Sequence, residues 1–268
     1  NMTHSIPQTA LSVLHTKYGK IAYSLDFKLD NTPVLGNKPS YETLEKLENV
    51  KVLFLDIDGV LSGSKKGINY PNPHTEVIAG LKTIRAKGIP VILCTGNYYY
   101  AKLPIIQMAH LNNPHITDGG ALITDPLDKK VIKKHAMKKE LVKELIDTCI
   151  KNNIYIEVYT DQQYFLEKSQ IQELTKTRDI ILQQEPVVCD FVLSVIKNKD
   201  IIKVNVFLKT PLEKEQALAV LQPFQKELTI TWTGNPALPG IFPANITARG
   251  ISKKSAAIDA IESLGLSF

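Results

Sequence analysis

Two aspartates, Asp56 and Asp58, carry the clearest chemical signal in the sequence. They follow residues 50–55, of which five of six are apolar, and they precede Gly59. A short continuous apolar run indicates a strand that is buried on both faces, as in a parallel sheet. Side chains two residues apart on a strand point the same way. We therefore expect two carboxylates at the carboxyl end of a strand, where α/β sheets bind ligands.

The close spacing of these two carboxylates predicts a divalent cation, because like charges repel unless a cation screens them. We expect Mg²⁺, held by Asp56 and by the main-chain carbonyl of Asp58. A carboxylate can attack a phosphoryl group, so Asp56 is the candidate nucleophile. Asp58 is the candidate acid and base, which protonates the leaving oxygen and later activates water. The alternative for the pair alone is a strand that ends in an acidic turn.

Two weaker signals lie further along the chain. Thr95 and Gly96 end a second apolar run, residues 90–95, and a hydroxyl with a free main-chain N–H behind it suits a phosphate oxygen. Lys253, next to Lys254, stands at the expected start of a helix, from which an ammonium group can reach a phosphate and the nucleophile. Each signal has an ordinary alternative: Thr-Gly pairs end many strands, and lysine pairs commonly lie on solvated helix faces.

The elements that must position these groups alternate between strand and helix. The pattern gives a strand at 50–55, a helix at 74–87, a strand at 90–95, a helix at about 98–111, and a strand and turn at 116–120. This order predicts a doubly wound parallel sheet with right-handed crossovers, that is, an α/β fold with a Rossmann-like core. A last helix, 251–264, would carry Lys253 in its first turn.

Three regions follow from the pattern along the chain. Residues 1–48 are polar and weakly periodic, and we interpret them as an N-terminal extension with little regular structure. Residues 125–243 change to a mixed pattern, which predicts an inserted α+β cap domain. The core would then comprise residues 49–124 and 244–268.

Composition narrows the class of protein. The 268 residues are 44% hydrophobic and 22% charged, and the net charge is only +5. These values fit a globular protein and argue against a nucleic-acid partner. No apolar run suggests a signal peptide or a membrane span, so no membrane partner is expected. Three widely spaced cysteines, Cys94, Cys149 and Cys189, read as reduced core residues of a cytoplasmic protein.

In this order and on this frame, the motifs resemble those of the haloacid dehalogenase-like superfamily. Residues 56–61, Asp-Ile-Asp-Gly-Val-Leu, look like its first motif, residues 93–96 like its second, and residues 250–253 like its third. The resemblance implies a set of roles: Asp56 as nucleophile, Asp58 as acid and base, Thr95 as phosphate ligand, Lys253 as the motif lysine, and Gly59, Gly96 and Asn97 beside the substrate.

Residues 117–121 are similar to a turn found in one subgroup of this superfamily, which carries a class-two, subtype-B cap. The block at 125–243 has the place and size of that cap. Sucrose-phosphate phosphatases, phosphomannomutases and many sugar-phosphate phosphatases belong to the subgroup. The resemblance therefore implies Mg²⁺-dependent hydrolysis of a small phosphorylated metabolite through an aspartyl-phosphate, with the cap setting specificity.

Two departures from the family pattern matter. The residue after Thr95-Gly96 is often Arg in the subgroup, whereas here it is Asn97. The fourth motif, an acidic Gly-Asp-x-x-x-Asp stretch that completes the Mg²⁺ site, does not occur before Phe268. Asp26 and Asp30 lie in the N-terminal extension without the Gly-rich turn of that motif. The chain is either truncated or has lost normal metal binding.

The missing fourth-motif strand would also leave one edge of strand 50–55 without a neighbour, and the N-terminal extension is a candidate to cover it. Two alternatives to the phosphatase hypothesis stay open. One is a phosphomutase, which shares the core chemistry. The other is a catalytically impaired phosphate-binding or regulatory protein. The sequence does not give the particular substrate or the oligomeric state.

Overall fold

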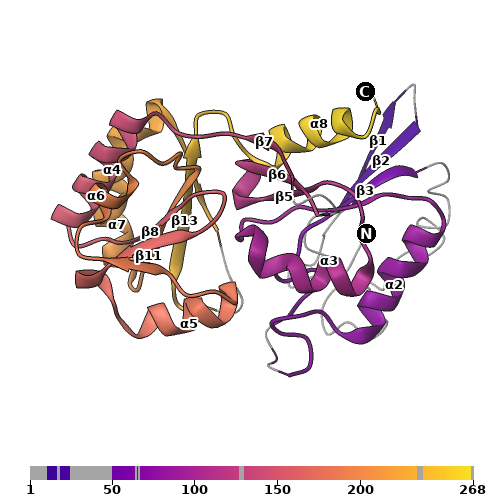
Figure 1. The fold of residues 1–268 in the computed structure, drawn as a ribbon, viewed down its shortest axis with the longest axis horizontal. Helices are drawn as coiled ribbons and strands as arrows, with labels where there is room; N and C mark the ends of the chain where they lie inside the picture. The colour runs from indigo at the N-terminus through magenta and orange to yellow at the C-terminus, as the bar shows by residue number, and fades with distance from the viewer. Residues whose placement is uncertain are drawn as a thin grey trace.

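The computed structural model describes residues 11–16, 19–24, 50–63, 65, 67–126, 130–233 and 238–266 of the chain. They form two lobes, a core lobe and a cap lobe, each built around its own sheet (Figure 1). The core lobe contains segments from both sides of the cap lobe in the sequence. Among the described residues, we find no helix with the length and apolar character that crossing a membrane requires.

The centre of the core sheet is parallel. β3 (Val50–Leu55) pairs in parallel with β4 (Val91–Leu93). A parallel bridge between Cys94 and Ile116 then joins β4 to β5 (His115–Thr117). These pairings, with helices between successive strands, confirm the predicted Rossmann-like α/β core.

Two strands that the sequence pattern did not suggest extend the core sheet beyond β5. β6 (Leu122–Asp125) pairs antiparallel with β5, and β7 (Lys130–Lys134) pairs antiparallel with β6. β7 is mostly exposed and carries three lysines, so it has no buried apolar alternation from which a strand can be recognised.

The other edge of β3 is covered by the N-terminal region. β1 (Leu11–Thr16) and β2 (Gly19–Ser24) form an antiparallel hairpin, and β2 pairs in parallel with β3. An open strand edge presents unpaired N–H and C=O groups, and β2 supplies their partners along β3. Part of the predicted extension, 1–48, is thus integral to the core sheet and covers the edge for which it was a candidate, whereas the prediction of little regular structure was wrong for residues 11–16 and 19–24. Asp26 and Asp30 lie outside the described residues.

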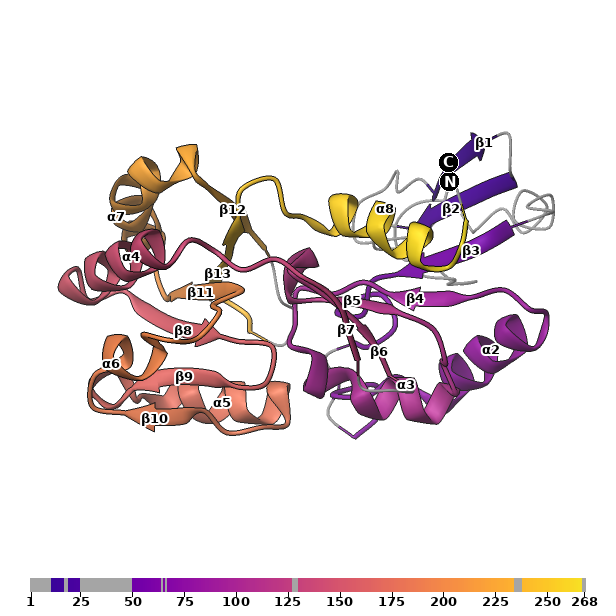
Figure 2. The same ribbon diagram turned by 45° about the horizontal axis from the view of Figure 1, so that its top comes forward.

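Helices cover both faces of the core sheet (Figure 2). α2 (Thr75–Ala86) and α3 (Leu103–Ala109) pack on one face in a cluster that includes Leu55. α8 (Lys253–Ser263) packs on the other face in a cluster that includes Val52. Because side chains alternate along β3, the strand is buried on both faces, as its continuous apolar run predicted. The helix expected at about 98–111 begins as a 3₁₀ turn, and the α-helix proper starts at Leu103.

The cap lobe is a six-stranded, largely antiparallel sheet with strand order β10-β9-β8-β11-β13-β12. Its elements in chain order are α4 (Lys139–Lys151), β8 (Tyr155–Tyr159), β9 (Tyr164–Glu167), α5 (Glu173–Leu182), β10 (Val187–Cys189), α6 (Val192–Ile196), β11 (Lys203–Leu208), α7 (Pro211–Leu221), β12 (Leu228–Trp232) and β13 (Phe242–Ala248).

The two faces of the cap sheet differ in character because polar and apolar side chains alternate along β11, β12 and β13. Val204, Val206 and Ile246 point into an apolar cluster with α4, α6 and α7. Their neighbours Asn205 and Thr247 lie on the opposite face and line a cavity against the core lobe. The alternation of side chains along these strands therefore gives the cap an apolar interior on one face of its sheet and a polar wall on the other.

Strand pairing sets the boundaries of the two lobes differently from the predicted insertion at 125–243. β7, which ends at Lys134, still belongs to the core sheet, whereas β13 continues the cap sheet to Ala248. The cap elements thus run from Lys139 to Ala248. The predicted limits followed changes in sequence character, and these changes do not coincide with the points at which the chain moves between the two sheets.

A fully buried histidine is expected to make the core lobe sensitive to acid. His115 Nδ1 accepts a hydrogen bond from the main-chain N–H of Leu93 (3.1 Å), and Nε2 lies 3.3 Å from the carbonyl oxygen of Leu111. Burial lowers the pKa of His115 to about 4. The unfolded chain, with a histidine pKa of about 6.5, takes up the proton at higher pH than the native protein.

We therefore expect the free energy of unfolding to fall as pH drops from about 6.5 to about 4, with His115 contributing roughly 3 kcal/mol of the loss. Urea unfolding at pH 7 and at pH 4.5 measures this loss. The variant His115→Asn, which cannot take up the proton, should be less stable at pH 7 but should lose less on acidification. An equal pH dependence in the two proteins would contradict the assignment.

Candidate active site

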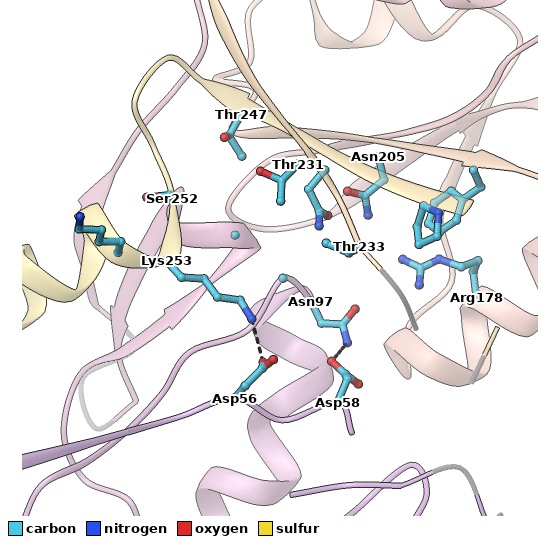
Figure 3. Close-up of a pocket in the computed structure, with 16 residues that line it drawn as sticks. Asp56, Asp58, Asn97, Arg178, Asn205, Thr231, Thr233, Thr247, Ser252 and Lys253 are labelled. Atoms are coloured by element: carbon cyan, nitrogen blue, oxygen red, sulfur yellow. Dashed lines mark hydrogen bonds and ion pairs between the residues drawn. The ribbon is translucent and has the colours of Figure 1, made fainter. Parts of the chain in front are cut away.

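The carboxyl ends of β3 and β4 bring the predicted site residues together at the end of the core sheet that faces the cap (Figure 3). Asp56 and Asp58 follow β3, Asn97 follows β4, and Lys253 begins α8. These four side chains line a cavity of about 320 Å³ between the two lobes. Residues almost 200 positions apart in the chain thus meet at one site.

Asp56 is paired with the lysine of the predicted third motif. Lys253 Nζ lies 2.9 Å from Asp56 Oδ1, and the main-chain N–H of Ile57 donates to the same oxygen (2.9 Å). Burial raises the pKa of Asp56, and the charge of Lys253 opposes that rise. The lysine therefore favours the ionised carboxylate, which is the form that can act as a nucleophile.

Asp58 is held by three side chains. Asn97 Nδ2 donates to Asp58 Oδ2 at 2.6 Å, and Thr95 Oγ1 donates to the same oxygen at 3.4 Å. Lys102 Nζ lies 3.6 Å from Asp58 Oδ1, and Lys102 is only 3% exposed. These contacts fix the direction in which the carboxyl group of Asp58 points.

Thr95, Gly96 and Gly59 occupy different positions from one another with respect to the cavity. Gly96 lines it, but Thr95 is fully buried behind it, where its Oγ1 also accepts from the main-chain N–H of Asn97 (3.0 Å). Gly59 does not line the cavity, and its N–H donates to the carbonyl of Ser62 (2.8 Å). Through these contacts Thr95 helps to hold Asp58, and Gly59 takes part in the turn that follows the aspartates.

The N-terminus of α8 places Lys253 rather than Lys254 toward the aspartates. Ser252 caps the helix through a hydrogen bond from the main-chain N–H of Ser255 (3.2 Å). Lys253, the first helical residue, reaches Asp56, whereas Lys254, which also lines the cavity, is exposed. Successive helical residues point about 100° apart, so only one of two neighbouring lysines can reach the same carboxylate.

The cap supplies most of the remaining cavity wall. Arg178 of α5 reaches the cavity, but its guanidinium donates to both carboxylate oxygens of buried Glu157 (3.0 and 3.2 Å from Nε). The other cap residues with polar side chains in the wall are uncharged: Asn205, Thr231, Thr233, Asn245 and Thr247. Asn205 is 6% exposed, and its buried Oδ1 has no hydrogen-bond partner among the described residues.

The model of the haloacid dehalogenase-like hydrolase family matches residues 53–268, most of the chain. The chain belongs to this family. Membership supports a hydrolase of the phosphatase type and agrees with the motif resemblance. The matched region contains both aspartates, Thr95 and Lys253.

Solved structures of the family share the fold of both lobes. A haloacid dehalogenase-like hydrolase from Bacteroides thetaiotaomicron superposes with a TM-score of 0.67 at 18% identity, covering 81% of this chain and 78% of that one. A sugar phosphatase described as belonging to subclass IIB superposes with a TM-score of 0.65 at 24% identity, covering 81% of this chain and 77% of that one. At these identities the similarity concerns the fold.

Two curated relatives match shorter stretches. A Buchnera aphidicola protein, named provisionally as a phosphatase, is 31% identical over 112 residues, which are 41% of this chain and 40% of that protein. Ribonuclease J of Methanocaldococcus jannaschii is 52% identical over 52 residues, which are 19% of this chain and 12% of that enzyme. The chain thus spans well under half the length of either relative.

Few side chains at the cavity could bind the Mg²⁺ ion that the family implies. The described residues contain no cluster of three or more histidine, cysteine or acidic side chains that could hold a metal. Asp56 and Asp58 nevertheless line the same cavity, and both described contacts of Asp56 fall on Oδ1. Mg²⁺ is often bound by one or two carboxylates together with water and substrate phosphate, so the residues fit a weak site of that kind.

A close approach between two loops holds Lys253 in place. A Cβ on Gly120 would lie 2.3 Å from the carbonyl oxygen of Ser252, and the φ of Gly120 is +105°. Only glycine therefore allows the turn after β5 to pack against the start of α8. Gly250 also has positive φ (+78°), but a Cβ there would meet no atom of a described residue within 4 Å.

The variant Gly120→Ala should lose more stability than its control Gly250→Ala. The control should cost about 1–2 kcal/mol, from the left-handed conformation alone. Gly120→Ala adds the clash with Ser252 and should also move Lys253, so phosphate-ester hydrolysis should fall by about 10²-fold, as misplaced catalytic groups cause elsewhere. Urea unfolding and an aryl phosphate assay measure both effects, and equal behaviour of the two variants would contradict this packing argument.

Proposed function

We propose that the protein hydrolyses small phosphomonoesters through an aspartyl-phosphate formed on Asp56. The observation that carries the proposal is the paired arrangement at the cavity: Lys253 contacts Asp56, and Asn97 holds Asp58 beside it. Two carboxylates in different surroundings can take different roles in one reaction. Membership of the hydrolase family supports this assignment.

In the first step, an Asp56 oxygen attacks phosphorus, a new O–P bond forms, and the ester P–O bond breaks. Asp58 donates its proton to the leaving alcohol oxygen. In the second step, Asp58 takes a proton from water, which attacks phosphorus and releases inorganic phosphate and the free Asp56 carboxylate. Lys253, held at Asp56, balances negative charge on the phosphoryl group.

A bound Mg²⁺ ion would add positive charge at the phosphoryl oxygens. The groups that would hold it are the Asp56 carboxylate and the main-chain carbonyl of Asp58. The amide of Asn97, which replaces the arginine common at this position, contacts Asp58 in the structure. We therefore assign Asn97 to orienting the acid rather than to binding a second anionic group of the substrate.

The cap wall favours an uncharged, hydroxyl-rich leaving group, such as a sugar or polyol. Its polar groups are amides and hydroxyls, and the charge of Arg178 is already balanced by Glu157. Phe207, the aromatic side chain in the wall, has the Arg178 guanidinium 4.6 Å from its ring centroid, so one ring face is occupied. Asn205 lines this wall and no described residue bonds to its Oδ1, so we assign this oxygen to accept a hydrogen bond from a substrate hydroxyl.

The variant Asn205→Ala should therefore raise KM for a hexose phosphate by about 5- to 30-fold, the effect of removing one hydrogen bond of 1–2 kcal/mol. Hydrolysis of p-nitrophenyl phosphate, which offers no hydroxyl to the cap, should stay within about twofold of wild type. Asn198→Ala, at a position outside this cavity wall, is the control. A rise in KM of the same size for both esters would exclude recognition of a substrate hydroxyl by Asn205.

The direct test of the proposal is phosphate release from p-nitrophenyl phosphate and from a panel of sugar phosphates, with Mg²⁺ and with a chelator. Transfer of the phosphoryl group to a second sugar hydroxyl instead of water would identify a phosphomutase. Binding of inorganic phosphate by calorimetry without turnover would identify a phosphate-binding protein. The described residues include no cluster of three or more metal-binding side chains. This is the observation that favours the phosphate-binding alternative for this chain.

A further inference from the structure

A lysine of the cap reaches into the core lobe. Lys203 is the first residue of β11 in the cap sheet, yet its Nζ lies 2.5 Å from Asp118 Oδ1 and 3.1 Å from the carbonyl oxygen of Gly96. The ammonium also lies 4.0 Å from the centroid of the Tyr159 ring. Asp118 and Gly96 belong to the loops that follow β5 and β4, so one cation joins the cap to two core loops.

This ion pair is fully enclosed. Both side chains have an exposed fraction of 0%, and burial raises the pKa of Asp118 while it lowers the pKa of Lys203. Asp118 also has a positive φ of 54°, which is uncommon for residues other than glycine. Buried pairs often contribute little net stability, and we relate this pair to the geometry that it imposes.

The main chain of residues 95–97 is the part of the core lobe whose geometry this ion pair affects. The main-chain N–H of Gly119 donates to the carbonyl of Thr95 (3.1 Å), and the N–H of Asp118 donates to the carbonyl of Asn97 (2.9 Å). Lys203 binds the carbonyl between them, that of Gly96. Three successive carbonyl groups are thus fixed from one side, by the Asp118 turn and by the lysine.

The side chains of the same loop hold the acid. Asn97 Nδ2 and Thr95 Oγ1 both donate to Asp58 Oδ2, and the side chain of Asn97 lines the cavity. A shift of the 95–97 backbone would therefore carry these two donors away from Asp58. The path from Lys203 to Asp58 consists only of contacts in the structure, and Lys203 does not itself line the cavity.

We propose that Lys203 is a positioning residue: a cap lysine that fixes the 95–97 loop and thereby orients Asp58 for proton transfer. This role rests on the proposed function of Asp58. It also makes the cap part of the catalytic apparatus, in addition to its part in selecting substrates. A cap exchanged between related enzymes would need a lysine at this position to keep the core chemistry intact.

The test compares two variants with wild type. Lys203→Met removes the cation but leaves buried Asp118 unpaired, which can prevent folding. The double variant Lys203→Met/Asp118→Asn removes both charges, and asparagine tolerates positive φ. Lys138→Met, which breaks an exposed ion pair with Glu227 in the cap, is the control for loss of a cap charge. Circular dichroism melting identifies the folded variants.

The readout is the dependence of kcat on the leaving group. An alkyl phosphate needs a proton from Asp58, whereas p-nitrophenolate leaves without one. In the folded double variant, kcat for the alkyl phosphate should fall by at least about 30-fold, and kcat for p-nitrophenyl phosphate by less than about fivefold, as expected for impaired general acid catalysis. KM for both esters should change little, and Lys138→Met should match wild type.

Equal losses for the two esters, a loss confined to KM, or wild-type rates in a folded double variant would each overturn the positioning role. If wild type itself hydrolyses neither ester, the proposed function fails instead. A crystal structure of the double variant then decides about Lys203. Separation of Asn97 Nδ2 from Asp58 Oδ2, which are 2.6 Å apart here, supports the role, and an unchanged contact excludes it.

Discussion

Asp56→Asn should abolish phosphatase activity while the protein stays folded. An amide of the same shape cannot attack phosphorus, so kcat should fall by more than about 10³-fold, as when other covalent nucleophiles are removed. The fold should survive because the substitution removes a carboxylate whose burial is unfavourable. Its partner Lys253 is about one-third exposed, so water can reach the ammonium group after the substitution.

The measurement is release of p-nitrophenolate under single-turnover and steady-state conditions, together with thermal unfolding of the same preparation. Asp147→Asn is a matched control, because Asp147 lies on the cap surface in an ion pair with Lys151. A kcat of Asp56→Asn within tenfold of wild type would exclude Asp56 as the nucleophile. Loss of the thermal transition would show instead that Asp56 is needed for folding.

Asp58→Asn should slow turnover by about 10²–10⁴-fold for esters with poor leaving groups, the range seen when a general acid is removed. The asparagine side chain can still accept a hydrogen bond from Asn97 through its oxygen, so the loop at 95–97 should keep its position. It cannot donate a carboxylic proton, so the loss should shrink for a nitrophenolate leaving group.

Plotting log kcat against the pKa of the leaving alcohol for wild type and Asp58→Asn measures this difference. We expect a steeper negative slope for the variant, because the uncatalysed departure of a basic alkoxide is slow. Parallel lines with a common offset would assign Asp58 to charge or structure rather than to proton transfer. The two aspartate variants thus differ in a measurable way, since Asp56→Asn should be inactive with every leaving group.

The parts of the site that could be predicted from sequence are those set by local pattern. The apolar run before Asp56 fixes a buried strand, and the end of that strand fixes where both carboxylates point. Lys253 follows from a capped helix start, and the structure places it on Asp56. In each case the chemistry and the element that positions it lie within a few residues of each other.

The remaining residues depend on contacts between distant segments. Lys102 was not predicted because it lies in a tyrosine-rich stretch that reads as an ordinary helix, and only the bend before α3 brings it to Asp58. Lys203 was not predicted because a lysine at the start of a strand normally ends in solvent. Asn205 was not predicted as a site residue because alternation along β11 shows only which side chains share a face of the strand. It does not show that this face lies against the core lobe.

The fold shows the same division. The parallel order of β3, β4 and β5 follows from alternating strands and helices, which have few allowed connections. β2 and β7 did not emerge from the pattern. β2 is defined by the open edge of β3, and β7 by its pairing with β6. Strand partners at a sheet edge are a property of the assembled sheet, and a short polar strand carries little local signal of them.

The position of α8 on the core sheet has a consequence for synthesis of the protein. Val52, Phe54, Ile92 and Ile116 lie under α8, in one cluster with Ala256 and Ala260. The ribosome makes these strand residues before the whole cap and makes α8 after it. The cap can complete its own sheet while this face of the core is still bare, because the apolar cluster that packs against the cap sheet lies within residues 137–248. A nascent chain therefore carries an uncovered apolar surface for more than a hundred residues of elongation, the interval in which chaperone binding and aggregation compete with folding.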